Sequence, residues 1–123
     1  MRYLLLIYTD ENFVRKLSPT EGQQMMAAFM RFGEELKQAG AWIGSDRLRP
    51  VATATTVRVR DGQRLTTDGP FAETKEQLGG YYLINAGNLD EALAWAAKIP
   101  SAKHGSIEVR PIWEVGPEGY KDN

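Results

Sequence analysis

The chain has 123 residues, a formal net charge of −1 and no cysteine. This length predicts a single domain, and the near balance of 15 Lys and Arg against 16 Asp and Glu argues against a nucleic-acid partner, which would need a basic surface. The absence of cysteine excludes disulfides, thiolate nucleophiles and cysteine metal sites, and it fits a cytoplasmic location.

The N-terminal segment, residues 2–8, is apolar at both alternating sets of positions. This pattern predicts a central strand that is covered on both faces. The run is too short to cross a membrane and is followed at once by Asp10 and Glu11, so a strand explains it better than a signal peptide or a membrane span.

After an irregular polar stretch, Ser18, Pro19 and Glu21 predict the start of a helix with a capping box. Gly40 supplies its left-handed stop. Methionines on this helix could line a ligand pocket, but a stripe at helical spacing is more often part of the core. The predicted core stripe consists of Met25, Met26, Phe29, Phe32 and Leu36.

The middle of the chain predicts a short strand within residues 41–49 and then a β-hairpin. Residues 53–60 alternate, and the dipeptide Asp61-Gly62 is the two-residue turn that joins them to residues 64–67. The hairpin leads directly to Asp68.

The last third predicts a second central strand over residues 77–85 and a helix that Asn88 caps. A final strand follows over residues 106–115, and residues 116–123 are expected to form a flexible tail. Trp95 falls outside the centre of the helical stripe, which consists of Leu89, Leu93, Ala96 and Ala97.

These elements predict an α+β fold: a ferredoxin-like sandwich with an antiparallel sheet, two helices on one face and an inserted β-hairpin, in one domain over residues 1–115. Right-handed crossovers place both helices on the same face, yet the central strands are apolar on both faces. Because no further element of the chain can cover the second face, we expect a homodimer whose sheets face each other.

Residues 66–80 concentrate ionisable side chains, a turn and two glycines between predicted strands. The Asp-Gly-Pro-Phe run by itself is typical of a structural turn. Because it continues into the ionisable residues Glu73, Lys75 and Glu76, a binding role is as well supported as a purely structural one. Lys75 and Glu76 are either a solvated pair or, through Lys75, an anchor for an anion. His104 is either a surface group or a proton-transfer group.

The block from Thr66 to Tyr82, together with the N-terminal run and residues 53–59, resembles the DGPF branch of the YCII-related proteins over residues 1–115. The resemblance implies a bacterial protein that forms a dimeric α/β barrel. Members of the wider family carry a His on the first helix and an Asp as a proposed acid/base pair in a pocket between sheet and helix. This chain has no His in residues 18–40, so that pair is not carried over; Asp68 matches the motif.

We therefore expect a small-molecule pocket beside the Asp-Gly-Pro-Phe loop, with cofactor-free acid/base catalysis as one option and no metal. The alternative is a non-catalytic accessory protein linked, as the resemblance implies, to an extracytoplasmic-function sigma factor. The candidate catalytic residues are Asp68 and His104. The candidate ligand-binding residues are Asp68, Gly69, Phe71, Lys75, Glu76, Tyr81 and Tyr8.

Overall fold

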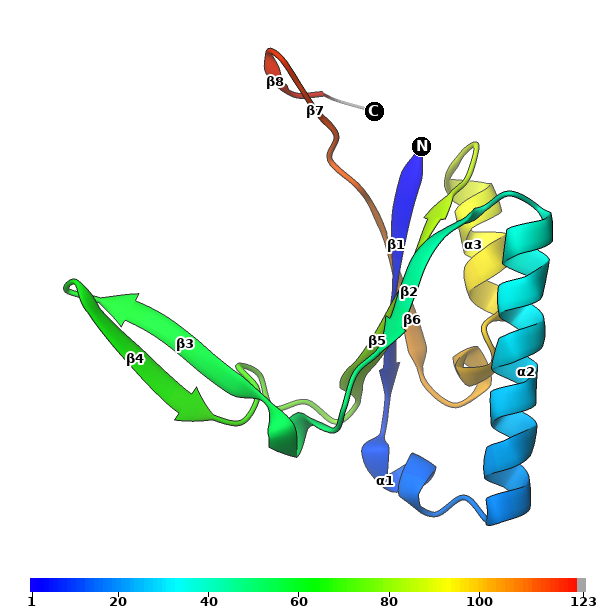
Figure 1. The fold of residues 1–123 in the computed structure, drawn as a ribbon, viewed down its shortest axis with the longest axis horizontal. Helices are drawn as coiled ribbons and strands as arrows, with labels where there is room; N and C mark the ends of the chain where they lie inside the picture. The colour runs from blue at the N-terminus through cyan, green and yellow to red at the C-terminus, as the bar shows by residue number, and fades with distance from the viewer. Residues whose placement is uncertain (122–123) are drawn as a thin grey trace.

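The computed structural model describes residues 1–121 and contains a four-stranded antiparallel sheet with its long helices on one face (Figure 1). The strand order is β2-β5-β1-β6, the order of a ferredoxin-like arrangement. No helix in this part of the chain is long and apolar enough to span a membrane. The elements are β1 (Arg2–Thr9), α1 (Glu11–Arg15), α2 (Pro19–Gln38), β2 (Trp42–Arg47), η1 (Val51–Thr53), β3 (Thr55–Arg60), β4 (Gln63–Asp68), β5 (Gln77–Asn85), α3 (Leu89–Lys98), η2 (Pro100–Lys103), β6 (Ser106–Pro111), β7 (Val115–Gly116) and β8 (Gly119–Tyr120).

Both long helices begin where the sequence predicts. At α2 the Ser18 Oγ accepts a hydrogen bond from the Glu21 N–H at 3.1 Å, and the Glu21 carboxylate accepts one from the Ser18 N–H at 2.9 Å. These bonds lower the pKa of Glu21. At α3 the Asn88 side chain accepts from the Glu91 N–H at 2.9 Å. The predicted caps are therefore confirmed, because each satisfies donors that a helix leaves free.

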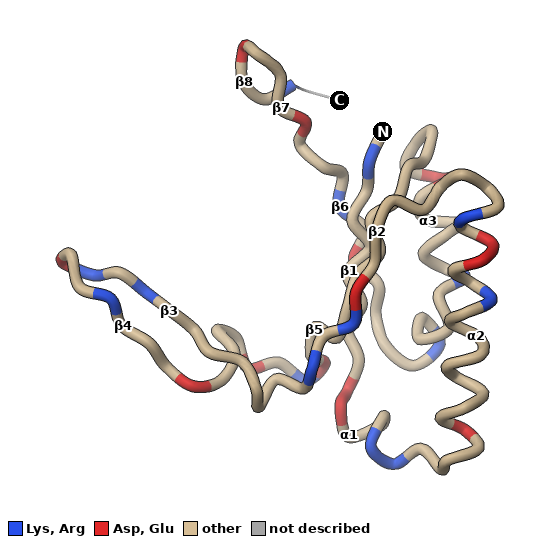
Figure 2. Tube along the Cα trace, viewed as in Figure 1, with Lys and Arg blue, Asp and Glu red and all other residues tan. Residues whose placement is uncertain are grey.

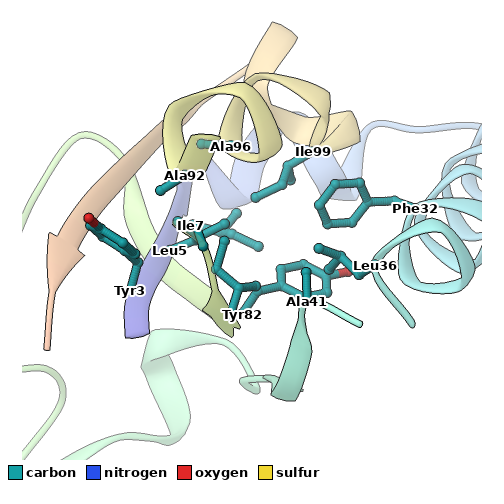
Figure 3. Close-up of a cluster of buried hydrophobic side chains, with 12 residues drawn as sticks. Tyr3, Leu5, Ile7, Phe32, Leu36, Ala41, Tyr82, Ala92, Ala96 and Ile99 are labelled. Atoms are coloured by element: carbon teal, nitrogen blue, oxygen red, sulfur yellow. The ribbon is translucent and has the colours of Figure 1, made fainter. Parts of the chain in front are cut away.

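The hydrophobic core lies between the sheet and the two helices (Figure 3). Tyr3, Leu5 and Ile7 of β1 point toward the helices and are buried, which confirms β1 as a central strand. The Phe32 ring of α2 meets the Tyr82 ring of β5 edge-on, with 5.0 Å between ring centroids. Aromatic pairs in this geometry contribute about 1 kcal/mol beyond the area that they bury.

The helical stripes differ from the prediction in part. On α2 only Phe32 and Leu36 are fully buried, and Met26 is exposed. On α3 the buried residues are Ala92 and Ala96, whereas Leu89 and Leu93 are exposed. Helix α3 is rotated relative to the prediction, because Trp95, which the predicted stripe left out, packs on the core. Its ring lies 6.1 Å from that of Phe32.

Two hairpins leave the sheet on the side away from the helices (Figure 1). The β3–β4 hairpin turns at Asp61 and Gly62, which both have positive φ, as its turn sequence predicts. The β7–β8 hairpin occupies part of the segment expected to be a flexible tail; residues 122–123 lie outside the described part. The final strand also ends earlier than predicted, at Pro111, and the irregular stretch after β1 contains the short helix α1.

Candidate functional site

The face of the sheet opposite the helices, here called the open face, has apolar side chains at its centre and a polar end where β1 ends. The residues of β1 that alternate with its buried positions lie on this face and are only partly buried. Apolar side chains occupy the centre, and hydroxyl and carboxyl groups gather near the end of β1. The rows of the open face, read from strand register, are Asn85–Arg2 at the start of β1, then Leu83–Leu4–Arg110, then Asp46–Tyr81–Leu6–Glu108, and then Leu78–Tyr8–Ser106.

Two hydroxyl–carboxylate pairs stand at the polar end of the open face. The Tyr81 hydroxyl donates to Asp46 Oδ2 at 2.7 Å, and the Ser106 hydroxyl donates to Glu76 Oε1 at 2.8 Å. The hydrogen bond to Asp46 raises the pKa of Tyr81, so the phenol stays protonated over a wider pH range. A carboxylate has several acceptor positions, so each retains capacity for a second donor.

The C-terminal half of the 66–80 stretch is tied to the base of the sheet. Gln77 accepts from the Glu11 N–H at 3.0 Å and donates to the Thr74 carbonyl at 2.7 Å. Glu11 in turn accepts from the Val51 N–H at 2.8 Å. These bonds join the loop, α1 and η1, and so hold Glu76 next to Ser106.

The Asp-Gly-Pro-Phe half belongs to the β3–β4 hairpin instead. Gly69 has a φ of +100°, which only glycine adopts readily, and its N–H donates to the Ala54 carbonyl at 2.7 Å. Thr56 donates to the Gly69 carbonyl at 2.9 Å. The Phe71 side chain is 73% exposed, and the Asp68 carboxylate makes no side-chain hydrogen bond or ion pair with any residue in 1–121. The motif therefore has a structural role as a turn, and the Asp68 carboxylate is left without a side-chain partner among residues 1–121.

His104 lies elsewhere, on the helical side of the sheet. Its ring stacks on Phe13 of α1 with 4.6 Å between centroids. Both rings line a cavity of about 610 Å³ between α1, α2 and η2, with Met25 and Ala28 on its α2 wall. Charged side chains surround the opening, including the Lys98–Glu35 ion pair at 2.7 Å.

The structure thus divides the predicted site residues into three groups. Tyr8, Tyr81 and Glu76 share the open face. Asp68, Gly69 and Phe71 stand on the hairpin, with Lys75 exposed in the loop between, and His104 lies at the cavity. A joint Asp68–His104 site within one protomer is absent from the described arrangement.

Sequence reasoning missed Asp46 and Ser106, which complete the two hydroxyl–carboxylate pairs. Asp46 meets Tyr81 through the register between β2 and β5, and Ser106 meets Glu76 where the loop before β5 passes β6. The bonded residues are 35 and 30 positions apart, so short stretches of sequence do not reveal them. Residues 1–121 contain no group of three or more His, Asp or Glu side chains that could hold a metal ion.

Comparison with known proteins gives a family and a fold. Residues 1–116 match the model of the YCII-related domain. An uncharacterised protein of Rhizobium meliloti (strain 1021) is 40% identical over 114 residues, which are 91% of this chain and 92% of that protein.

A solved structure shares the fold at 17% identity and a TM-score of 0.50, covering 97% of this chain and 99% of the other. It is 5-chloro-2-hydroxyhydroquinone dehydrochlorinase (TftG) from Burkholderia phenoliruptrix AC1100 in complex with 2,5-dihydroxybenzoquinone. The extent of the domain match and the identity to the Rhizobium protein together show that this chain belongs to the YCII-related family.

Proposed function

We propose that this protein is a homodimer that binds a small hydroxylated molecule at the polar end of the open face. The observation that carries the proposal is the juxtaposition of the Tyr81–Asp46 and Ser106–Glu76 pairs on one sheet face. Two carboxylates with remaining acceptor capacity suit a ligand that offers hydroxyl donors.

The surroundings of these pairs suit a ring-shaped ligand. Tyr8 and Leu78 lie in the same row as Ser106 and provide an aromatic and an aliphatic surface. Binding sites of this kind combine apolar walls with a few oriented polar groups. The fold neighbour TftG holds a dihydroxybenzoquinone, which is consistent with such a ligand on this fold.

The same pairs provide acid/base chemistry without a cofactor. The raised pKa of Tyr81 keeps its phenol protonated, and the hydrogen bond from that phenol orients Asp46 as an acceptor for a proton from the ligand. The predicted catalytic role of Asp68 requires the loop to approach such a ligand. The link to a sigma factor stays a prediction.

A second copy of the chain is proposed to cover the apolar centre of the open face. Leu4, Leu6 and Leu83 are adjacent in neighbouring strands and only partly buried, although they point away from the helices. Burial of apolar surface at about 25 cal/mol per Å² favours pairing of two such faces. The symmetric arrangement is a two-fold dimer of facing sheets.

Binding is tested with 2,5-dihydroxybenzoquinone and a panel of dihydroxybenzenes by isothermal titration calorimetry. Tyr81→Phe removes the phenol that orients Asp46, and we expect the Kd to rise about tenfold, since a misdirected Asp46 would lose the ligand's own hydrogen bond to its carboxylate, which contributes about 1.5 kcal/mol. Tyr120→Phe, which removes an exposed phenol in the β7–β8 hairpin, is the matched control and should leave the Kd unchanged.

If Tyr81→Phe and Asp46→Asn both bind like the parent while His104→Gln does not, the site lies in the cavity beside α2 and the proposal is wrong. The dimer is tested by light scattering, where Leu6→Glu should give a particle of one chain. A parent protein with the mass of one chain at micromolar concentration would refute the dimer.

A further inference from the structure

The β3–β4 hairpin, here called the arm, has no support from the rest of its own protomer. Its strands pair over six residues each, from Thr55↔Asp68 to Arg60↔Gln63. Within the described residues neither strand packs extensively on any element except the other. An isolated two-stranded hairpin is marginally stable in water, so this arm needs a surface to pack on.

Both faces of the arm carry exposed apolar side chains. Strand register places Val57 and Val59 on one face, while Leu65 lies opposite Arg58 on the other. Arg58 extends over the Phe71 ring, with 5.0 Å to its centroid, so Phe71 shares the face with Leu65. All four apolar residues are exposed, and a patch of this kind on a soluble chain marks an interaction surface.

The direction and charge of the arm indicate what it meets. It projects from the open-face side of the sheet, away from the helices (Figure 1). Arg58, Arg60 and Arg64 outnumber its two acids, Asp61 at the tip and Asp68 at the end of β4, so the arm carries a small positive charge (Figure 2). The open face, by contrast, carries carboxylates at Asp46 and Glu76, while its Glu108 is paired with Arg110 at 3.3 Å. A second copy of this chain therefore offers both the leucines at the centre of its open face and the carboxylates that complement the arm.

We infer that the arm of each protomer docks on a second copy of the chain and carries Asp68 and Phe71 to that copy's open-face site. Each site then consists of the Tyr81–Asp46 and Ser106–Glu76 pairs of one protomer and the Asp-Gly-Pro-Phe loop of the other. Asp68, which has no side-chain partner in its own described protomer, would face the ligand from across the interface. The inference rests on the proposed function, because it needs both the dimer and the open-face site.

Docking of the arm is tested with two leucines of nearly equal exposure. Leu65 on the arm is 48% exposed and Leu93 on α3 is 46% exposed. We expect Leu65→Ser to raise the dissociation constant of the dimer about tenfold in sedimentation velocity, as for a central interface residue, and Leu93→Ser to leave it unchanged. Equal dissociation constants for the two variants would overturn the docking of the arm, even with the dimer intact.

Delivery of Asp68 across the interface is tested by mixing two defective chains. Tyr81→Phe and Asp68→Asn homodimers should each bind 2,5-dihydroxybenzoquinone weakly. In a heterodimer isolated with two affinity tags, one site carries both defects and the other carries neither, so about half of the sites should bind like the parent. If Asp68 acts on its own protomer, both sites stay defective and no binding returns, which would overturn the inference.

The remaining outcomes separate this inference from the proposed function. An Asp68→Asn homodimer that binds like the parent removes Asp68 from the site but leaves the open-face proposal in place. A Tyr81→Phe homodimer that binds like the parent refutes the open-face site, and the inference falls with it.

Discussion

Two apolar residues of α2 that look equivalent in sequence should respond very differently to truncation. Leu36 is 0% exposed and sits in the core, whereas Met26 is 61% exposed. Leu36→Ala removes buried methyl groups and leaves a cavity, which costs about 3 kcal/mol within the usual range of about 2–5 kcal/mol. Met26→Ala should stay within about 0.5 kcal/mol, as is typical of surface positions.

The difference is large compared with the total free energy of unfolding, which is about 5–15 kcal/mol for domains of this kind. For a chain of this length, about 1 kcal/mol shifts the Tm by about 4 °C, so Leu36→Ala should melt about 12 °C below the parent. Urea unfolding followed by tryptophan fluorescence measures the free energies directly, because Trp95 packs on the core.

Equal losses of unfolding free energy for the two variants would contradict the exposure of Met26 on the surface of α2. They would mean that the outer face of α2 is also buried, as in a dimer formed through the helices. The proposed pairing of open sheet faces would then be wrong as well.

Three further predictions concern backbone packing, pH and capping. Gly105→Ala should destabilise the protein by about 2 kcal/mol or more in urea unfolding, because the new Cβ would overlap the Tyr8 backbone carbonyl near the end of β1. Gly22→Ala, with open space around it inside α2, should instead stabilise the protein by about 1 kcal/mol. Changes of the same sign in both variants would contradict this difference in packing. Hydrogen bonds from Arg2 at 2.7 and 2.9 Å lower the pKa of Glu114 below its ordinary value of 4.5, so the contribution of this pair to stability is present above pH 4.5 and is lost as the pH falls through the lower folded-state pKa. Glu114→Gln should therefore flatten the acid limb of the stability–pH curve, and an unchanged limb would count against the pair. Ser18→Ala should cost about 1 kcal/mol by loss of the cap, measured by thermal unfolding, with Thr20→Ala as an exposed neighbour that should cost less.

Local chemistry made much of the fold predictable. The caps at Ser18 and Asn88 and the turn at Asp61-Gly62 are made by residues within a few positions of one another, so short stretches of sequence are enough to predict them. The apolar run of β1 likewise predicts a central strand. The helical stripes were less predictable, since small rotations of a helix decide whether Trp95 or Leu93 meets the core.

The candidate site was predictable only in part. Tyr8, Tyr81 and Glu76 were identified as binding candidates, but their hydroxyl and carboxyl partners were not. The hydrogen bonds that define the site join residues 35 and 30 positions apart and depend on which strands are neighbours. Asp68 and His104, both singled out by residue type, are separated because Asp68 is the last residue of the arm and His104 follows η2.

The sequence by itself determined the order of the four sheet strands and the two long helices, the starts of those helices and the turn of the arm. These depend on side chains that act within one turn or one strand. Only the tertiary structure decided that the Asp-Gly-Pro-Phe loop stands away from the sheet and that Tyr81 meets Asp46. Strand register and the exit direction of the arm set these positions, and both result from packing between segments distant in sequence.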